Sequence, residues 1–226
     1  MTHILDHPIW SALATRHQAL AVGDSRARRY QPDVVPFAAA ADNAPDNIAA
    51  LARLIAPSEN IYVMQAGEIV LPEGFVAVTR AQGVQMVATN TAPPIADARI
   101  APLGPGDAAD MLALAALTKP GPFTMRALSL GRFWGVKVHG RLIAMAGERM
   151  AQPGFTELSG VCTHPDAQGQ RLGRILSLFV ADQIRARGDT PYLHAYATNP
   201  VAVKLYESIG FTIRCAMNVA IIARQT

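Results

Sequence analysis

Apolar residues recur at helical spacing in one long segment of the chain, residues 169–187. This spacing predicts an amphipathic helix that ends at Gly188, since glycine readily takes the left-handed conformation that follows a helix. The apolar stripe of this helix consists of Leu172, Ile175, Leu176, Phe179, Val180 and Ile184. Shorter patterns of the same kind predict helices over residues 8–21, 45–56, 107–118 and 200–209.

Short apolar runs between these helices predict strands. In the second half they cover residues 99–103, 131–138, 141–150, 155–163, 192–196 and 211–222, and in the first half 26–35, 60–65, 75–79 and 84–88. The segments 131–138 and 141–150 flank His139 and Gly140, which predicts a hairpin. Strands that alternate with helices indicate a mixed α/β sheet.

The segment between the two halves is rich in proline. Pro93 and Pro94 are adjacent, and residues 90–97 therefore form the best linker candidate. We predict an N-terminal α/β region over residues 1–95 and a second domain over residues 96–226.

Composition narrows the function classes. The formal net charge is +3, and no run of five or more Lys or Arg occurs, which argues against a nucleic-acid partner and suits an anionic small ligand. Cys162 and Cys215 fall in apolar strand-like segments, where we expect buried reduced thiols, and no metal site is expected. The chain has no apolar run of membrane-spanning length and no signal-peptide pattern, so no membrane partner and a cytoplasmic location are expected.

One segment carries a candidate ligand site, the turn that follows the predicted strand 155–163. Residues 168–173 read Q-G-Q-R-L-G and open the long helix, where the first N–H groups have no intrahelical partner. Gly169 and Gly173 allow a ligand to approach the backbone, and Arg171 and Arg174 add positive charge. The turn predicts phosphate binding, with an ordinary capped surface helix as the alternative.

A second motif, N-P-V-A-V-K-L-Y-E-S-I-G-F, follows over residues 199–211. Together the two motifs resemble the acyl-CoA-binding core of the GCN5-related N-acetyltransferase (GNAT) superfamily. Gln168 and Gly173 fit the first and last positions of its Gln/Arg-x-x-Gly-x-Gly/Ala pattern, whereas Arg171 stands in place of the middle glycine. The second motif matches through Asn199, Leu205, Tyr206, Gly210 and Phe211.

More narrowly, the chain resembles the FR47-like subgroup, related to glycine N-acyltransferases. The segments K-P-G-P-F, A-M-A-G-E-R and V-C-T-H-P-D carry this likeness. The resemblance implies a GNAT acyl-CoA N-acyltransferase fold, and residues 1–95 are compatible with the degenerate acyltransferase-like half that some relatives carry. It implies acetyl-CoA as co-substrate, without a metal. The implied cofactor-binding residues are Val161, Cys162, Thr163, Gln168, Gly169, Gln170, Arg171, Leu172, Gly173, Arg174, Asn199 and Lys204.

Acyl transfer to an amine requires a base for the ammonium and an acid for the leaving thiolate. Glu157 lies 11 residues before Gln168, which matches the catalytic glutamate of the histone-acetyltransferase branch, and is the candidate base; a solvated strand edge is the alternative. With a four-residue loop over 151–154, Glu148 would face Glu157, and one of the two pKa values would rise. A raised pKa suits a base that works near neutrality, so Glu148 is also a candidate catalytic residue. Tyr206 is the candidate acid by resemblance, with packing against the cofactor as the alternative.

The resemblance implies direct transfer of an acetyl group to a primary amine, in a ternary complex with a small molecule or amino acid; a protein N-terminus or lysine is also open. His194, residues 119–123, Phe133 and Trp134 are candidates for the acceptor wall. One rival is a non-catalytic CoA-binding sensor or structural module, which the Arg171 departure favours. The other is an N-acyltransferase that uses a longer acyl-CoA. A homodimer through an exposed strand edge is compatible with such a sheet.

Overall fold

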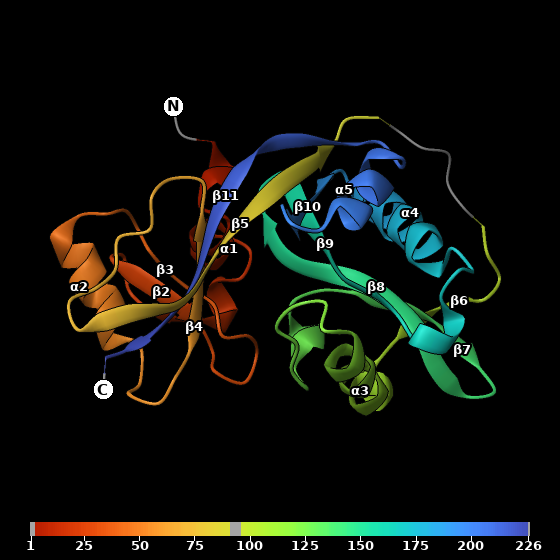
Figure 1. Ribbon diagram of the computed structural model, residues 1–226, viewed down its shortest axis with the longest axis horizontal. Helices are drawn as coiled ribbons and strands as arrows, with labels where there is room; N and C mark the ends of the chain where they lie inside the picture. Colours follow the sequence, from red (N-terminus) through yellow and green to blue (C-terminus); the bar gives the residue numbers. More distant parts are fainter. Residues whose placement is uncertain (1–2, 91–95, 226) are drawn as a thin grey trace.

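The computed structural model describes residues 3–90 and 96–225. Within them the chain forms a three-stranded sheet, β1-β2-β3, and an eight-stranded sheet, β4-β11-β5-β10-β9-β8-β7-β6 (Figure 1). The strands are β1 (Ala21–Gly23), β2 (Ala27–Tyr30), β3 (Ala38–Ala40), β4 (Ile61–Gln65), β5 (Phe75–Ala88), β6 (Ile100–Leu103), β7 (Phe133–Val138), β8 (Arg141–Gln152), β9 (Phe155–Thr163), β10 (Thr190–Tyr196) and β11 (Phe211–Arg224). The predicted mixed α/β fold is confirmed.

The α-helices cover both faces of the large sheet. They are α1 (Pro8–Ala14), α2 (Pro45–Arg53), α3 (Ala108–Thr118), α4 (Leu172–Arg185) and α5 (Pro200–Glu207). On β8, Ala144 packs in the cluster formed by α4, whereas the next residue, Met145, packs in the cluster formed by α3. Because successive side chains of a strand point to opposite faces, α3 and α4 lie on opposite sides of the sheet.

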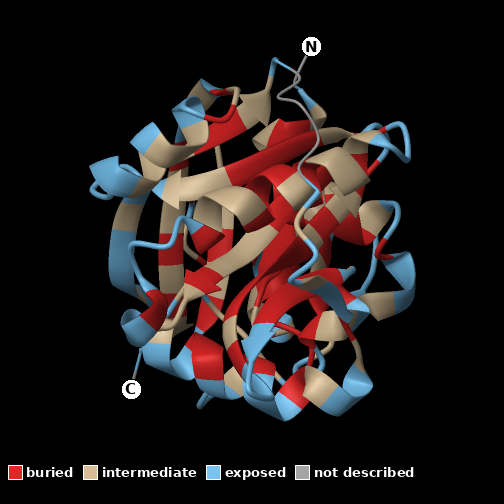
Figure 2. Cartoon of the chain, turned by 90° about the vertical axis from the view of Figure 1, so that its right-hand side faces the viewer, coloured by how far each residue is buried: buried red, intermediate tan, exposed pale blue. Residues whose placement is uncertain are grey.

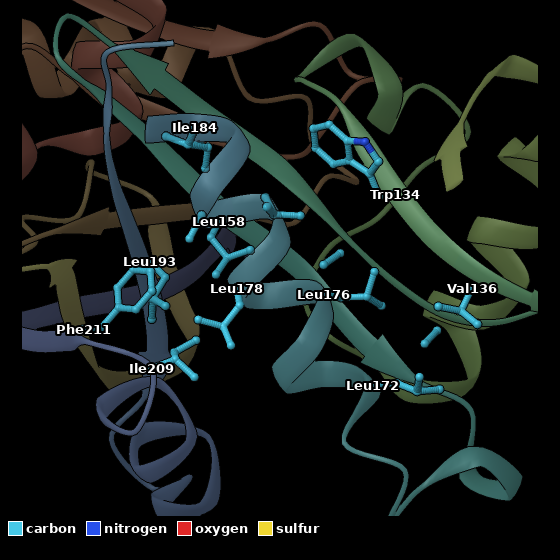
Figure 3. Packing of buried hydrophobic residues seen from close by; sticks show 14 of the residues in the cluster. Trp134, Val136, Leu158, Leu172, Leu176, Leu178, Ile184, Leu193, Ile209 and Phe211 are labelled. Atoms are coloured by element: carbon cyan, nitrogen blue, oxygen red, sulfur yellow. The ribbon is translucent and has the colours of Figure 1, made fainter. Parts of the chain in front are cut away.

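The largest core cluster lies under α4. Figure 3 shows Leu172, Leu176 and Ile184 of this helix directed toward Trp134 and Val136 on β7 and toward neighbouring strands. In Figure 2 the buried residues concentrate in the strands, and the exposed ones lie on loops and on the outer faces of helices. The expected helical stripe is confirmed in part. Leu172, Leu176, Val180 and Ile184 are buried in this cluster and Phe179 packs against it, whereas Ile175 is not part of it and Leu178 and Ala181 are. No helix of the described residues is long and apolar enough to cross a membrane.

Several predicted boundaries shift. The hairpin at His139 and Gly140 is confirmed, and both residues have positive φ, 49° and 81°. Helix α4 begins at Leu172 rather than at residue 169, and the predicted strands 75–79 and 84–88 are one continuous strand, β5. Residues 91–95 of the expected linker lie outside the described residues.

Strand β5 joins the two halves of the chain. It comes from the N-terminal half but lies between β10 and β11, and in Figure 1 β5 and β11 run side by side from the region of α2 and β4 toward that of β10 and α5. Ion pairs add to this connection, because Arg214 binds Asp6 and Arg16 binds Asp189. One sheet therefore crosses the expected boundary at residues 95 and 96, and the division into two domains stays a prediction.

The register between β8 and β9 corrects one prediction. Gln152 pairs with Phe155, so the connecting turn has two residues rather than four, and Gly154 has a positive φ of 79°. The register then shifts between Glu148, which pairs with Leu158, and Ala151. The prediction that Glu148 faces Glu157 was wrong, because the shorter turn and this irregularity place residues 149 and 150 in that position.

Candidate active site

Strands β9 and β10 diverge at the centre of the large sheet. They are parallel and pair from Thr190 opposite Phe155 to Tyr192 opposite Glu157, and among the described residues of both strands the pairing stops there. Beyond this point β10 continues alongside β5 and β9 continues alongside β8. The backbone of both strands is thus available to a ligand between them.

A bulge on β9 lies beside this opening. Ser159 pairs with Gly147 and Cys162 with Met145, so two residues, Gly160 and Val161, lie opposite one residue of β8. Gly160 has a φ of 63°, and a Cβ there would lie 2.9 Å from the ring of Phe133. Only glycine fits both requirements. The bulge frees backbone groups near Val161, the part of β9 expected to bind the cofactor.

The turn expected to bind phosphate lies between β9 and α4, but its helix begins later than expected. A short 3-10 helix (Pro165–Ala167) ends β9, residues 168–171 are exposed, and α4 starts at Leu172. The residue before α4, Arg171, is left-handed with a φ of 59°, and no side chain caps the first turn of the helix. These exposed N–H groups fit an anionic ligand such as a phosphate.

The other expected cofactor residues divide into two groups. Asn199 is the N-cap of α5, where its side-chain oxygen accepts a hydrogen bond from Ala202 N at 3.1 Å, and Lys204 is exposed on the same helix. The side chains of Leu172 and Cys162 are buried in the core clusters, and burial raises the pKa of the Cys162 thiol to about 11. At these two positions only backbone groups are available to a ligand.

A cavity of about 230 Å³ lies at the opening between β9 and β10. On one side it is lined by Val161, His194, Asn199, Ala202 and Tyr206, and its other walls come from both halves of the chain. Residues 119–122 line it, as expected, whereas Trp134 packs against Phe179 of α4 at 5.7 Å and does not. The remaining lining residues are Ile9, Phe37, Tyr62, Met64, Gly83, Arg149, Ala195, Tyr196, Met217 and Val219.

Glu157 is sealed behind this cavity, with none of its side chain exposed. Arg149 donates to both of its carboxylate oxygens, with Nη2 2.6 Å from Oε1 and Nε 2.8 Å from Oε2. His194 Nδ1 lies 2.7 Å from Oε1. Burial acts to raise the pKa of Glu157, but the charge of Arg149 and the hydrogen bonds from Arg149 and His194 outweigh it and lower the pKa to about 2. The expected pKa rise from a neighbouring Glu148 was wrong for Glu157.

The hydrogen bonds of His194 define its tautomer. An ionised carboxylate only accepts, so Nδ1 donates to Glu157. The amide of Gln85 donates to Leu5 O and to His194 Nε2, because the Gln85 oxygen accepts from Arg214 Nε. His194 is thus a neutral imidazole between a carboxylate and an amide.

Comparisons with known proteins agree with this geometry. Residues 135–219 match the family model described as FR47-like protein. A crystal structure of a protein from Novosphingobium aromaticivorans, assigned to the GNAT family of acetyltransferases, is 40% identical, covers 100% of both chains and has a TM-score of 0.94. The chain belongs to the GNAT family. The predicted superfamily and its FR47-like subgroup are confirmed.

Two curated relatives match shorter stretches of this GNAT protein, 74 residues each. Mycothiol acetyltransferase of Thermomonospora curvata is 38% identical over 32% of this chain and 25% of its own length. [Ribosomal protein bS18]-alanine N-acetyltransferase of Salmonella typhimurium is 36% identical over 29% of this chain and 50% of its own length. The chain thus spans a quarter and a half of the curated relatives that it matches. Their names agree with the predicted acyltransferase class.

Tyr206 lies where the family motif places it, on α5 at the cavity. Its ring packs edge-on against Phe211, with centroids 6.1 Å apart. Burial, with the negative charge of Glu157, raises the pKa of its phenol to about 12. Tyr206 of this GNAT protein is therefore a neutral phenol, a potential proton donor, among the residues that line the cavity.

Glu148 occupies a different environment. It is buried, its carboxylate forms an ion pair with Arg187 and accepts from Arg132 N at 3.4 Å, and it is not among the cavity residues. Its expected catalytic role stays a prediction. Arg149 and Gln85, by contrast, were missed in the sequence. Arg149 belongs to the A-M-A-G-E-R segment, and a charge within such an apolar strand was a usable signal.

Proposed function

We propose that this protein is an N-acetyltransferase that acetylates the primary amine of a small molecule or amino acid, by direct attack in a ternary complex. The observation that carries the proposal is the cavity at the divergence of β9 and β10, which has Tyr206 and His194 on its wall and the exposed turn of α4 beyond. This arrangement offers separate places for a phosphate-bearing donor and an acceptor.

The residues present fit coenzyme A. The uncapped first turn of α4 and Arg171 would hold the phosphates, and the bulged backbone near Val161 would bind the chain that leads into the cavity. Asn199 keeps the start of α5 in place beside it. Acetyl-CoA supplies the activated acetyl group when it is bound.

Tyr206 is the proposed general acid. Its pKa of about 12 keeps the phenol protonated across the working pH range, and its side chain lines the cavity in which the thiolate would leave. An alkyl thiol has a pKa of about 8.5, so this phenol is the weaker acid. It would stabilise the departing thiolate by donating a hydrogen bond, and would release its proton once the bound donor lowers the pKa of the phenol.

His194 is the proposed base, in place of the direct role expected for Glu157. A carboxylate with a pKa of about 2 is a weak base, whereas imidazole side chains change charge between pH 5 and 8. Glu157 would orient His194 through Nδ1 and stabilise its protonated form. This role requires the Gln85 amide to move from Nε2 when the acceptor binds.

The test is turnover of acetyl-CoA with a panel of amines and amino acids, followed by release of the CoA thiol and by mass spectrometry of the product. We expect acetylated product, and loss of the acidic limb of the kcat/KM profile in His194→Gln. An acidic limb that persists in His194→Gln and disappears in Glu157→Gln would return the base role to Glu157.

The same assay separates the rivals. CoA binding by calorimetry without turnover of any amine would favour a sensor or structural module. A higher kcat/KM with octanoyl-CoA than with acetyl-CoA would favour the longer acyl donor.

A further inference from the structure

We propose that the acceptor is a free amino acid with an apolar side chain, and that Arg149 binds its carboxylate. This inference rests on the proposed acetyltransferase function and adds the class of acceptor. It starts from a guanidinium group that is only partly used by the protein.

Arg149 is fixed on two sides. Nε and Nη2 bind the two oxygens of Glu157, and the guanidinium carbon lies 5.0 Å from the ring centroid of Phe37. The side chain is 14% exposed, so its position is largely set by packing. A guanidinium held in this way loses little conformational entropy when it binds a second anion.

One edge of the Arg149 guanidinium is not used by Glu157, and Arg149 lines the cavity. Nη1 has no hydrogen-bond partner among the described residues, and a Cβ on Gly121, also a cavity residue, would lie 3.8 Å from it. Gly121 has a φ of 130°, which favours glycine, so no side chain at this position covers Nη1. A carboxylate beside Nη1 would accept charge-assisted hydrogen bonds from Arg149.

The charges around the cavity favour an anionic group on the acceptor. Arg149 and Lys119 line it, and no Asp or Glu is among the lining residues. The nearest carboxylate, Glu157, is fully buried, and both of its oxygens are engaged by Arg149, His194 and Met150 N. A diamine would find no partner for its second cation and would be repelled by Lys119.

Much of the remaining lining of the cavity is apolar. It contains side chains from α1, β4 and β11, together with Phe37 beside Arg149, and these match an apolar side chain on the acceptor better than a polar one. The apolar and aromatic residues of this lining are Ile9, Phe37, Tyr62, Met64, Met217 and Val219.

Wild-type protein provides the first test, because it needs no substitution. The kcat/KM for phenylalanine, methionine and leucine is compared with that for their amides, for phenethylamine and for an alanyl peptide amide at saturating acetyl-CoA. We expect the free acids to be preferred by about 10- to 100-fold. Equal rates for acids and amides, or a preference for the peptide amide, would overturn this inference and leave the acetyltransferase function intact.

Product binding gives a readout that does not need turnover. N-acetylphenylalanine should raise the melting temperature of the protein more than N-acetylphenylalaninamide at equal concentration. If no amine is acetylated, the proposed function fails, while this binding difference still decides whether Arg149 forms a carboxylate site. Equal shifts with the two compounds would overturn the site.

A pair of variants tests Arg149 itself. Arg149→Gln alone would leave Glu157 buried without its partner, so it is combined with Glu157→Gln to keep a neutral hydrogen-bonded pair. The double variant should lose the difference in melting temperature between the acid and the amide. Arg126→Gln removes an exposed arginine outside the cavity, paired with Asp33, and should keep it. A difference that survives in the double variant would contradict the assignment.

Discussion

The polar groups on the two sides of the cavity differ in what they bind. On the proposed acceptor side, Glu157 binds both Arg149 and His194 within the protein, and of these groups only Nη1 of Arg149 is left for a ligand. On the CoA side, the N–H groups of the first turn of α4 have no side-chain cap, and residues 168–171 are exposed. Closed networks stabilise the fold, whereas open groups are available to a ligand. Substitutions on the acceptor side should therefore change stability first, and those on the CoA side should change kcat or binding first.

The largest expected effect is on the acceptor side. Glu157→Leu would leave the Arg149 guanidinium largely buried without a counter-charge, and should lower the free energy of unfolding by about 3–5 kcal/mol. The double variant Arg149→Met/Glu157→Leu should recover much of this loss, since it removes both charges. Urea denaturation of the four proteins of the cycle measures the coupling. Additive losses would show that the ion pair is not what holds this side together.

A second effect depends on pH and comes from His17, a buried residue outside the cavity lining. His17 accepts a hydrogen bond from Tyr30, and burial lowers its pKa to about 4, below the value near 6.5 of the unfolded chain. The unfolded state therefore takes up a proton first as the pH falls. His17 should lower the free energy of unfolding by about 3 kcal/mol between pH 6.5 and 4, with little further change below pH 4.

Denaturation at a series of pH values checks this prediction against His17→Asn, which cannot titrate. Loss of stability through Glu157, whose pKa is lowered to about 2, starts only below the unfolded value of about 4.5. Burial also lowers the pKa of His7, but His7 is present in both proteins, so the difference between wild type and variant from pH 6.5 to 5 reports on His17. Identical slopes for wild type and variant in that window would show that His17 already carries a proton in the fold.

On the proposed CoA side, the residue to test is Tyr206. Tyr206→Phe keeps the ring packed against Phe211 and removes only the hydroxyl, so the fold should stay within about 1 kcal/mol of wild type. If Tyr206 is the general acid, kcat should fall by about 100-fold with little change in KM. A kcat within twofold of wild type would leave Tyr206 a packing residue and would weaken the contrast between the sides.

The same contrast explains what could be predicted from the sequence. The CoA side consists of local motifs, in which Asn199 caps the helix that bears Tyr206 and one turn opens α4. Such features depend on residues a few positions apart. The types and spacing of these residues therefore predicted this side of the site and the family of the chain.

The acceptor side could not be predicted in this way. Whether Arg149 or Glu148 faces Glu157 depends on a two-residue turn and a register shift between β8 and β9. A slip of this register by one residue would change which side chain faces Glu157. Gln85 reaches His194 because β5 inserts between β10 and β11, a long-range arrangement without a local signal. The wall of the cavity that comes from the N-terminal half likewise depends on long-range contacts and has no local signal in the sequence.

The smallest expected effect concerns Arg171, which stands in place of the motif glycine. Arg171 has a φ of 59°, in the left-handed region. A residue with a side chain is strained there by about 1 kcal/mol, whereas glycine is not. Arg171→Gly should therefore leave stability equal or raise it by less than about 1 kcal/mol, because the more flexible unfolded chain offsets part of the gain. It also removes a cation beside the turn, so affinity for CoA should fall by about 3- to 10-fold at low salt.

Arg171→Gln separates the backbone from the charge. It keeps a side chain in the left-handed conformation but is neutral, so it should lose the same affinity as Arg171→Gly without any gain in stability. Calorimetric titration with CoA at low and high salt, together with melting temperatures, distinguishes the two contributions. Tighter CoA binding by Arg171→Gly would mean that the arginine crowds the phosphates, and its departure from the motif would then favour the sensor over the enzyme. Weaker binding by both variants would mean that the guanidinium replaces the missing glycine as a phosphate ligand.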